Sequence, residues 1–232
     1  MIAAVVNAVV VVLGALIGNF VKGALPKRFS DILLQAMALS VMLIGLLGAM
    51  KAEDAIAVIL CLAIGGVLGE LLKIEQRLEK LGEIIKKRFA KNGQDGFAQG
   101  FVSASLLFCV GAMAVVGSLD AGLNADYTTI FAKSLIDCVT AVVLSSTMGL
   151  GVAFSAVTIL LYQGGITLAA SLLVPVLSTG VVALMSAVGS LLIVGIGFNM
   201  LGFVKIKVGN LLPAVFIAIA YVPIATWLTT LF

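Results

Sequence analysis

Long runs of hydrophobic residues, separated by short polar or charged stretches, make up most of this chain. A helix needs about 20 residues to cross a hydrocarbon layer about 30 Å thick, because each residue adds about 1.5 Å. Eight runs approach this length, at approximately 2–21, 32–50, 54–72, 99–117, 129–148, 151–174, 179–199 and 209–231. The pattern predicts an all-α fold, a polytopic transmembrane helix bundle that forms a single integral membrane domain over residues 1–232.

The sixth run allows a second interpretation. The sequence LLYQGGITLAA at 160–170 interrupts it with polar residues and adjacent glycines. A re-entrant pair of half-helices over 151–174 would leave seven spans instead of eight. Eight spans place Lys205 and Lys207 in a cytoplasmic loop, as their positive charge favours, whereas seven spans would place them outside.

Basic residues also set the expected orientation of the bundle. Cytoplasmic loops retain Lys and Arg, which places the basic segments 22–31 and 73–98 inside. The loop at 118–128 contains two aspartates and no basic residue, which suits the outside. With eight crossings, both termini are then expected outside the membrane.

Composition supports a membrane protein and removes several other classes. The chain is 62% hydrophobic and 11% charged, with a mean hydropathy of +1.26, whereas soluble domains are about 45–50% apolar and about 25% charged. So few charges cannot cover a water-soluble surface, which leaves the lipid bilayer as the surrounding medium. The net charge of +3 provides no broad basic face, so we expect no nucleic-acid binding.

The longest hydrophilic stretch, at 73–98, carries apolar residues at helical spacing between basic ones. It predicts a cytoplasmic amphipathic helix or loop within the membrane domain. Its apolar face can lie in the inner headgroup layer, where basic residues favour anionic lipid, or cover the cytoplasmic end of the bundle. A plain linker helix between two spans explains the same pattern.

Glycine is frequent, with 25 residues. Pairs four residues apart, such as Gly14 with Gly18 and Gly65 with Gly69, predict Gly-rich packing, because small residues let helix backbones approach. Other positions predict broken helices, which lipid tolerates only where the freed backbone groups are buried in protein or line a watery cavity. These candidate breaks are Gly149, Gly151, Gly164, Gly165, Asn210 and Pro213.

Few ionisable residues fall inside the expected spans, where each costs about 2.5–3.5 kcal/mol at the bilayer centre. Lys133 and Asp137 are four residues apart and share one face of the fifth expected helix, so they can form an ion pair next to Ser134. Asp137 is the most demanding group, since Lys133 lies nearer the outer end of its helix. Polar residues in other spans are candidate partners of this pair, namely Gln163, Asn7 and Asn199.

Two short segments at the ends of hydrophobic runs resemble each other, VLGELLKIE at 67–75 and MLGFVKIK at 200–207. Their spacing fits an internal duplication into two halves in parallel orientation. Glu70 lies within the first segment, at the inner edge of the third run and beside Lys73. We expect it to anchor that end of the helix at the membrane interface.

Several stretches together resemble a known family. They are FVSASLLFCVGAMAVVGSL at 101–119, Lys133 with Ser134 and Asp137, MGLGVAFSAV at 148–157, YQGGITL at 162–168 and KVGNLLPA at 207–214. This chain is similar across nearly its whole length to the prokaryotic membrane-protein family called domain of unknown function 554, of the YdfK type. The resemblance implies a multi-pass protein of the bacterial or archaeal cytoplasmic (inner) membrane, and it implies no catalytic residues.

These features predict a membrane transporter or channel for an ion or small solute, with the Lys133–Asp137 pair near its pathway. The alternative is a non-transporting scaffold or binding protein that acts through the helix at 73–98. An enzyme is not expected, because the chain has no histidine and no GxxxxGK[ST] motif. No cofactor or metal site is expected either. Small-residue faces self-associate, which favours a homo-oligomer with a dimer as the default.

Overall fold

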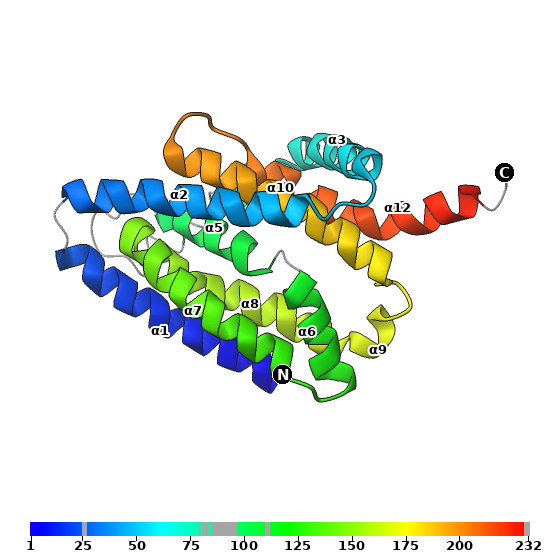
Figure 1. Ribbon diagram of the computed structural model, residues 1–232, viewed down its shortest axis with the longest axis horizontal. Helices are drawn as coiled ribbons and strands as arrows, with labels where there is room; N and C mark the ends of the chain where they lie inside the picture. The colour runs from blue at the N-terminus through cyan, green and yellow to red at the C-terminus, as the bar shows by residue number, and fades with distance from the viewer. Residues whose placement is uncertain (25–26, 79, 81–83, 85–96, 110–111, 230–232) are drawn as a thin grey trace.

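The computed structural model describes residues 1–24, 27–78, 80, 84, 97–109 and 112–229. These residues form helices joined by short connections, and no strand occurs within these ranges. The expected all-α bundle is therefore confirmed (Figure 1). The helices are α1 (Ile2–Ala24), α2 (Lys27–Ala49), α3 (Ala55–Leu72), α5 (Phe97–Cys109), α6 (Ala112–Leu123), α7 (Thr128–Met148), α8 (Gly151–Leu168), α9 (Ala170–Leu173), α10 (Thr179–Leu201), α11 (Val208–Leu211) and α12 (Pro213–Thr229).

Six helical segments within the described residues are long and apolar enough to cross a membrane. They belong to α1, α3, α7, α8 and α10 and to α11 continued into α12. The helices α5 and α6 meet at an angle of 59° and add a seventh span if they cross as one broken element. The remaining expected run, 32–50, falls in α2, whose apolar part Leu34–Ala49 is shorter than a full span. The described residues form a polytopic helical bundle with six to seven candidate spans, whereas the sequence predicted eight.

The expected interruption at Gly164 and Gly165 does not occur. Helix α8 is continuous from Gly151 to Leu168, so the structure contains no pair of half-helices at 160–170. A glycine inside a helix costs only about 1 kcal/mol relative to alanine, which the packing of α8 against its neighbours outweighs. The sharp bend lies instead between α5 and α6, in the fourth expected run.

The first three long helices each pack against a helix of the second half of the chain through glycines. In α1, Gly14 and Gly18 face α7, and a Cβ atom added at Gly14 would lie 2.6 Å from the carbonyl oxygen of Cys138. Helix α2 packs on α10 in the same manner, and α3 packs on α11 and α12. The GxxxG pairs of α1 and α3 are thus used for contacts within the chain.

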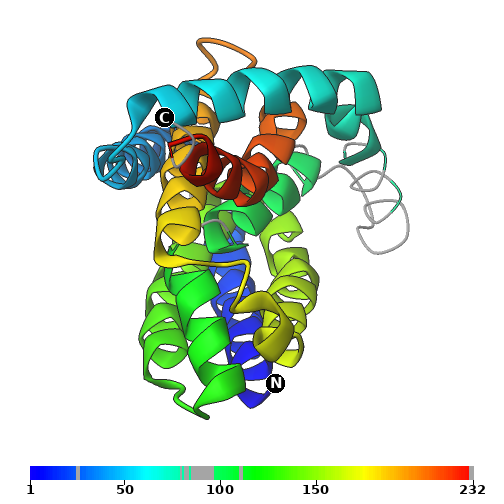
Figure 2. The same ribbon diagram turned by 90° about the vertical axis from the view of Figure 1, so that its right-hand side faces the viewer.

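Helix α3 does not run alongside α2 and α10. Figures 1 and 2 show that it crosses their direction on one side of the bundle, at the top of both views. Asp54 caps its first turn, because the carboxylate accepts the backbone N–H of Ala57 at 3.0 Å. The helix ends at Lys73, which adopts a left-handed conformation with φ of 52°. This turn directs the chain into a helical segment at 74–78.

The amphipathic helix expected at 73–98 is described only in part. Residues 74–78, 80 and 84 are helical. Positions 79, 81–83 and 85–96 lie outside the described residues, so the prediction for that stretch stays a prediction.

A polar network inside the helix bundle

Lys133 and Asp137 lie one turn apart on α7 and form the ion pair that their spacing predicts. Helices α1 and α8 pack against α7 (Figure 1). Only 6% of Lys133 and 5% of Asp137 is exposed. Attraction between the two charges offsets part of the free energy that burial would cost each of them alone.

Asn7 on α1 links this ion pair to α8. Its side-chain nitrogen Nδ2 donates to Asp137 Oδ2 at 3.0 Å and to Gln163 Oε1 at 3.1 Å. Both Asn7 and Gln163 are fully buried. The structure thus brings together Asn7, Lys133, Asp137 and Gln163, which the sequence places in three different spans. We call these residues the polar network.

Three buried polar side-chain atoms on α1 and α8 have no hydrogen-bond partner among the described residues. They are Asn7 Oδ1, Gln163 Nε2 and Thr167 Oγ1. An amide oxygen accepts hydrogen bonds, an amide nitrogen donates them, and a hydroxyl does both. Each such group left unpaired in a protein interior costs about 1–3 kcal/mol. The polar network therefore retains unused capacity to bind a group that both donates and accepts.

Thr167 was not among the candidates predicted from the sequence. It follows Gln163 by four residues on α8, which places both on one face of that helix. This spacing is a signal that the sequence carries. Thr167 is 8% exposed, and its side chain extends the polar face of α8 by one helical turn.

Phe108 and Ser134 border the polar network without joining it by hydrogen bonds. The Lys133 ammonium lies 5.9 Å from the centre of the Phe108 ring, within range of a cation–π interaction. Ser134 is buried, but its hydroxyl donates to the backbone oxygen of Ile130 at 2.8 Å. The Ser134 hydroxyl therefore uses its hydrogen within its own helix and donates no hydrogen bond to the polar network in this structure.

Asn199, predicted as a further partner, lies elsewhere. Its side-chain nitrogen donates to the backbone oxygen of Ile206, and its side-chain oxygen accepts the backbone N–H of Ile206, each at 2.7 Å. These two bonds close the turn between α10 and α11. The structure places Asn199 in this turn, not in the polar network.

Replacing Asn199 by alanine is expected to lower the free energy of unfolding by about 1–3 kcal/mol, because the backbone N–H of Ile206 loses its partner and the Ile206 oxygen keeps only the N–H of Val208. Thermal unfolding of the purified protein in detergent measures this. The matched control is Asn124→Ala, at an exposed position before α7, which should leave the melting temperature unchanged. A loss of transport without a loss of stability would instead place Asn199 on the solute pathway.

The other predicted breaks coincide with ends of helices. Gly149 ends α7 with φ of 81°, a conformation that glycine adopts without strain. Gly151 begins α8, where a Cβ atom would overlap the backbone of Phe97. Asn210 lies in the short helix α11, and Pro213 begins α12. None of these residues contacts the polar network in the hydrogen bonds that the described residues form.

A second polar cluster joins the end of α3 to α11. The ammonium of Lys207 donates to both oxygens of Glu70, at 2.9 and 3.0 Å, and Asn210 Nδ2 donates to Glu70 Oε2 at 2.6 Å. The backbone N–H of Glu75 donates to Asn210 Oδ1 at 2.7 Å. Glu70 is thus more than the interfacial anchor that we expected. We call Glu70, Glu75, Lys207 and Asn210 the polar seam. Glu70 and Glu75 belong to the segment 67–75, and Lys207 belongs to the similar segment 200–207.

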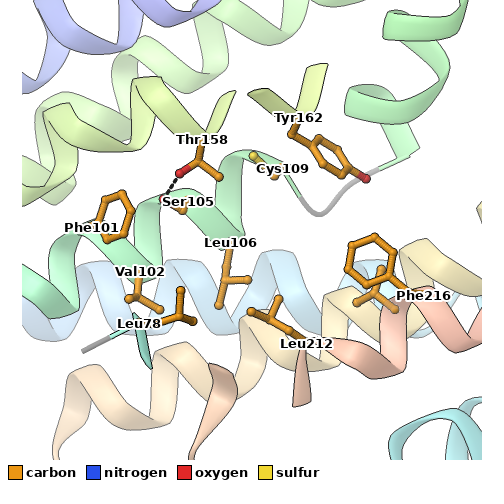
Figure 3. A pocket seen from close by; sticks show the side chains of 11 residues that line it. Leu78, Phe101, Val102, Ser105, Leu106, Cys109, Thr158, Tyr162, Leu212 and Phe216 are labelled. Carbon is orange, nitrogen blue, oxygen red and sulfur yellow. Dashed lines mark hydrogen bonds between the residues drawn. The ribbon is translucent and has the colours of Figure 1, made fainter. Parts of the chain in front are cut away.

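An apolar pocket of about 220 Å³ lies between α5, α8 and α12, near the polar seam (Figure 3). Hydrophobic side chains form most of its wall, and Leu78 and Leu212 approach it from the two sides of the seam. The hydroxyls of Ser105 and Thr158 also line it and hydrogen-bond to each other at 3.0 Å. No feature of the sequence indicated this pocket, because its wall consists of ordinary hydrophobic residues from distant segments.

An apolar helical bundle with a buried ionic network defines this molecule as a multi-pass α-helical membrane protein. The chain belongs to the family described as protein of unknown function DUF554, whose model matches residues 2–223. This result confirms the family resemblance that the sequence motifs indicated.

Two relatives support this assignment. The chain is 33% identical over 221 residues to the uncharacterized membrane protein YdfK of Bacillus subtilis (strain 168), covering 94% of this chain and 93% of YdfK. It is 28% identical over 217 residues to the uncharacterized protein YqgA of Escherichia coli (strain K12), covering 92% of each chain. No solved structure is significantly similar to this chain.

Proposed function

We propose that this protein transports a small polar solute or an ion across the cytoplasmic membrane of a prokaryote, and that the polar network is a binding site on its pathway. With an even number of crossings, the orientation that the basic loops favour places both termini outside. A charged residue within a membrane-spanning helix marks a functional site by default, because lipid makes such residues costly. Asp137 is the central group of the proposed site, with Lys133 as its counter-charge.

The unpartnered atoms beside Asp137 are the observation that carries this proposal. A buried ion pair kept only for structure needs hydrogen bonds to its own remaining donors and acceptors, but it does not need neighbouring polar groups that are themselves unsatisfied. Here Asn7 Oδ1 and Gln163 Nε2, on two residues hydrogen-bonded to the pair or to its partner, are buried without partners, and so is Thr167 Oγ1 one turn along α8. Buried polar groups in proteins are generally satisfied, so unsatisfied groups at one place support a site that a polar ligand occupies during the working cycle.

The hydrogen-bonding character of these unpartnered atoms favours one class of transported species. The charges of Lys133 and Asp137 cancel, so the polar network carries no net charge to attract a single ion. Its free groups are an acceptor on Asn7 and a donor on Gln163, and the hydroxyl of Thr167 lies one turn further along α8. A small solute with both donors and acceptors matches this set, whereas a bare cation would be repelled by the Gln163 amide hydrogens. We therefore favour a small uncharged or zwitterionic solute.

The broken helix beside the network supports movement during transport. Helices α5 and α6 meet at 59°, and α5 carries Phe108, whose ring lies under the Lys133 ammonium. Transporters commonly build their sites next to discontinuous helices, since these can shift without unfolding a whole span. In this proposal, a change at the α5–α6 junction opens the polar network to water.

Flux into proteoliposomes tests the proposal. The purified protein is reconstituted, and uptake of radiolabelled rubidium, chloride, zwitterionic amino acids, sugars and carboxylates is followed with and without a pH gradient. We expect uptake of one class of small polar solute, and Asp137→Asn should reduce its rate at least about tenfold, the equivalent of about 1.4 kcal/mol. The matched control is Asp31→Asn, the same change at an exposed position of α2.

Two results would contradict the proposal. If Asp137→Asn and Asp31→Asn leave every measured flux equal to that of the unmodified protein, Asp137 has no role in transport. If protein-free liposomes take up the same solutes at the same rate, the protein does not transport them. Selective loss with Asp137→Asn and normal uptake with Asp31→Asn supports it.

The scaffold alternative rests on the segment at 73–98. The described part of this segment exposes Lys73, Arg77 and Lys80, which could contact a cytosolic protein. Nothing in the geometry of the polar network favours this function over transport. It stays the second candidate, and capture of a cytosolic partner that depends on these three residues would support it.

A further inference from the structure

The apolar pocket is open toward the surface of the spanning helices. Phe216 of α12 lines it and is 54% exposed, within a segment apolar enough to cross a membrane. On the opposite wall, Leu106 of α5 is only 5% exposed. Figure 3 shows Leu106, Leu212 and Phe216 around the same space. The pocket thus has a buried apolar floor, and residues on its rim face the lipid.

One end of this pocket adjoins a group of exposed basic residues. Leu78 lines the pocket, and Arg77 precedes it directly in a helical segment. Lys73 lies in the turn that precedes this helical segment, and Arg77 and Lys80 are three residues apart within it. All three are exposed. The helical segment that contributes Leu78 to the pocket therefore also carries exposed basic side chains.

Among the described residues, the two carboxylates closest to these cations along the chain already have partners in the polar seam. Glu70 binds Lys207 and Asn210, and Glu75 Oε2 accepts the backbone N–H of Gly209 at 2.6 Å. The side chains of Lys73, Arg77 and Lys80 donate no hydrogen bond to any residue that the structure describes. These three side chains are consequently positioned to bind an anion from outside the protein.

We propose that the pocket and the neighbouring basic residues form a site for one anionic phospholipid. One acyl chain occupies the apolar space between α5 and α12, and the phosphate lies near Arg77 and Lys80. Charge complementarity selects this occupant, because an apolar pocket next to a basic surface matches an acyl chain attached to an anionic headgroup. A neutral apolar solute would make no use of the cations, and an acidic peptide would make no use of the pocket. This site is independent of the transport that we propose for the polar network.

Native mass spectrometry of the full chain in detergent tests this inference, with phosphatidylglycerol and phosphatidylcholine of identical acyl chains as probes. We expect one phosphatidylglycerol molecule to be retained more tightly than phosphatidylcholine. Arg77→Gln should weaken phosphatidylglycerol binding about fivefold and leave phosphatidylcholine unchanged, because one basic residue near an anionic lipid contributes about that much. Arg77 is exposed, so this variant should fold normally.

A second variant tests the pocket itself. Val102→Trp places a large side chain in the pocket from a partly buried position of α5 and should reduce retention of both lipids. Its melting temperature shows whether it is folded. Lys51→Gln removes an exposed cation in the connection before α3, and it should change neither affinity.

Three outcomes would overturn the inference. Equal retention of the two lipids, together with no effect of Arg77→Gln, means that the protein holds only its general lipid shell. Unchanged phosphatidylglycerol binding in a folded Val102→Trp variant means that the pocket holds no acyl chain. Displacement of the lipid by an acidic peptide at equal concentration assigns the basic face to a protein partner.

Discussion

Replacing Lys133 by methionine is expected to lower the free energy of unfolding by about 3–5 kcal/mol. The substitution keeps most of the side-chain volume but leaves Asp137 buried without its cation, and breaking one side of a buried ion pair costs about this much. Asp137 is only 5% exposed, so water cannot replace the lost partner. Equilibrium unfolding of the protein in detergent micelles, followed by tryptophan fluorescence or circular dichroism, measures the change.

Two further variants separate this effect from a general sensitivity to lysine substitution. Lys207→Met removes a cation from the Lys207–Glu70 pair, whose side chains are 57% and 58% exposed, and exposed pairs contribute only about 0–1 kcal/mol. The double variant Lys133→Met with Asp137→Leu removes both buried charges and should recover much of the lost stability. Equal losses for Lys133→Met and Lys207→Met would contradict the assignment of the first pair to the bundle interior.

The same double variant separates structure from function. A buried ion pair retained only to hold helices together can be replaced by apolar residues with little loss of stability. If the double variant is stable but transports nothing, the charges serve the solute. If it is stable and transports normally, the pair at Lys133 and Asp137 is structural and the proposed pathway lies elsewhere.

Gly18→Ala is expected to destabilise the protein by about 1–3 kcal/mol or more, because α1 and α7 pack too closely there to admit a methyl group. A Cβ atom at Gly18 would overlap the backbone carbonyl of Val142. The backbone of a helix cannot move aside as a flexible side chain can, so the two helices must separate. The melting temperature in detergent and the elution profile on a sizing column measure the effect.

Gly165 provides the matched control within the same bundle. It lies inside α8, and a Cβ atom there would have no atom within 4 Å. Gly165→Ala should therefore change stability by less than about 1 kcal/mol, and in the stabilising direction, since alanine favours a helix more than glycine does. A melting temperature that falls as far for Gly165→Ala as for Gly18→Ala would contradict the account of close packing.

Much of the site followed from spacing along single helices. Lys133 and Asp137 share a face because one turn of a helix separates them, and this required no knowledge of neighbouring helices. The partners across helices were harder to predict. Asn7 and Gln163 joined the pair, whereas Asn199 closed a turn instead, and nothing in the local sequence distinguishes an amide that faces the bundle from one that caps a loop.

Helix breaks were also hard to predict, because the local sequence does not show where a glycine interrupts a helix. Gly149 and Gly151 lie at the junction of two helices, but Gly164 and Gly165 lie within a continuous one. Glycine permits a break and does not require one, since its backbone can also adopt the helical conformation at a cost of only about 1 kcal/mol. The bend between α5 and α6 falls in a run that we expected to be a single straight span.

The sequence alone determined that this chain is an all-helical membrane protein, because the length and hydrophobicity of its runs depend only on local composition. It also determined that Lys133 and Asp137 form a pair, because both lie on one helix. Only the tertiary structure decided which residues complete the polar network, that α3 crosses the bundle, and that a pocket opens beside a basic surface. These features depend on contacts between helices that lie far apart in the chain, and between similarly apolar helices the sequence does not indicate which faces meet.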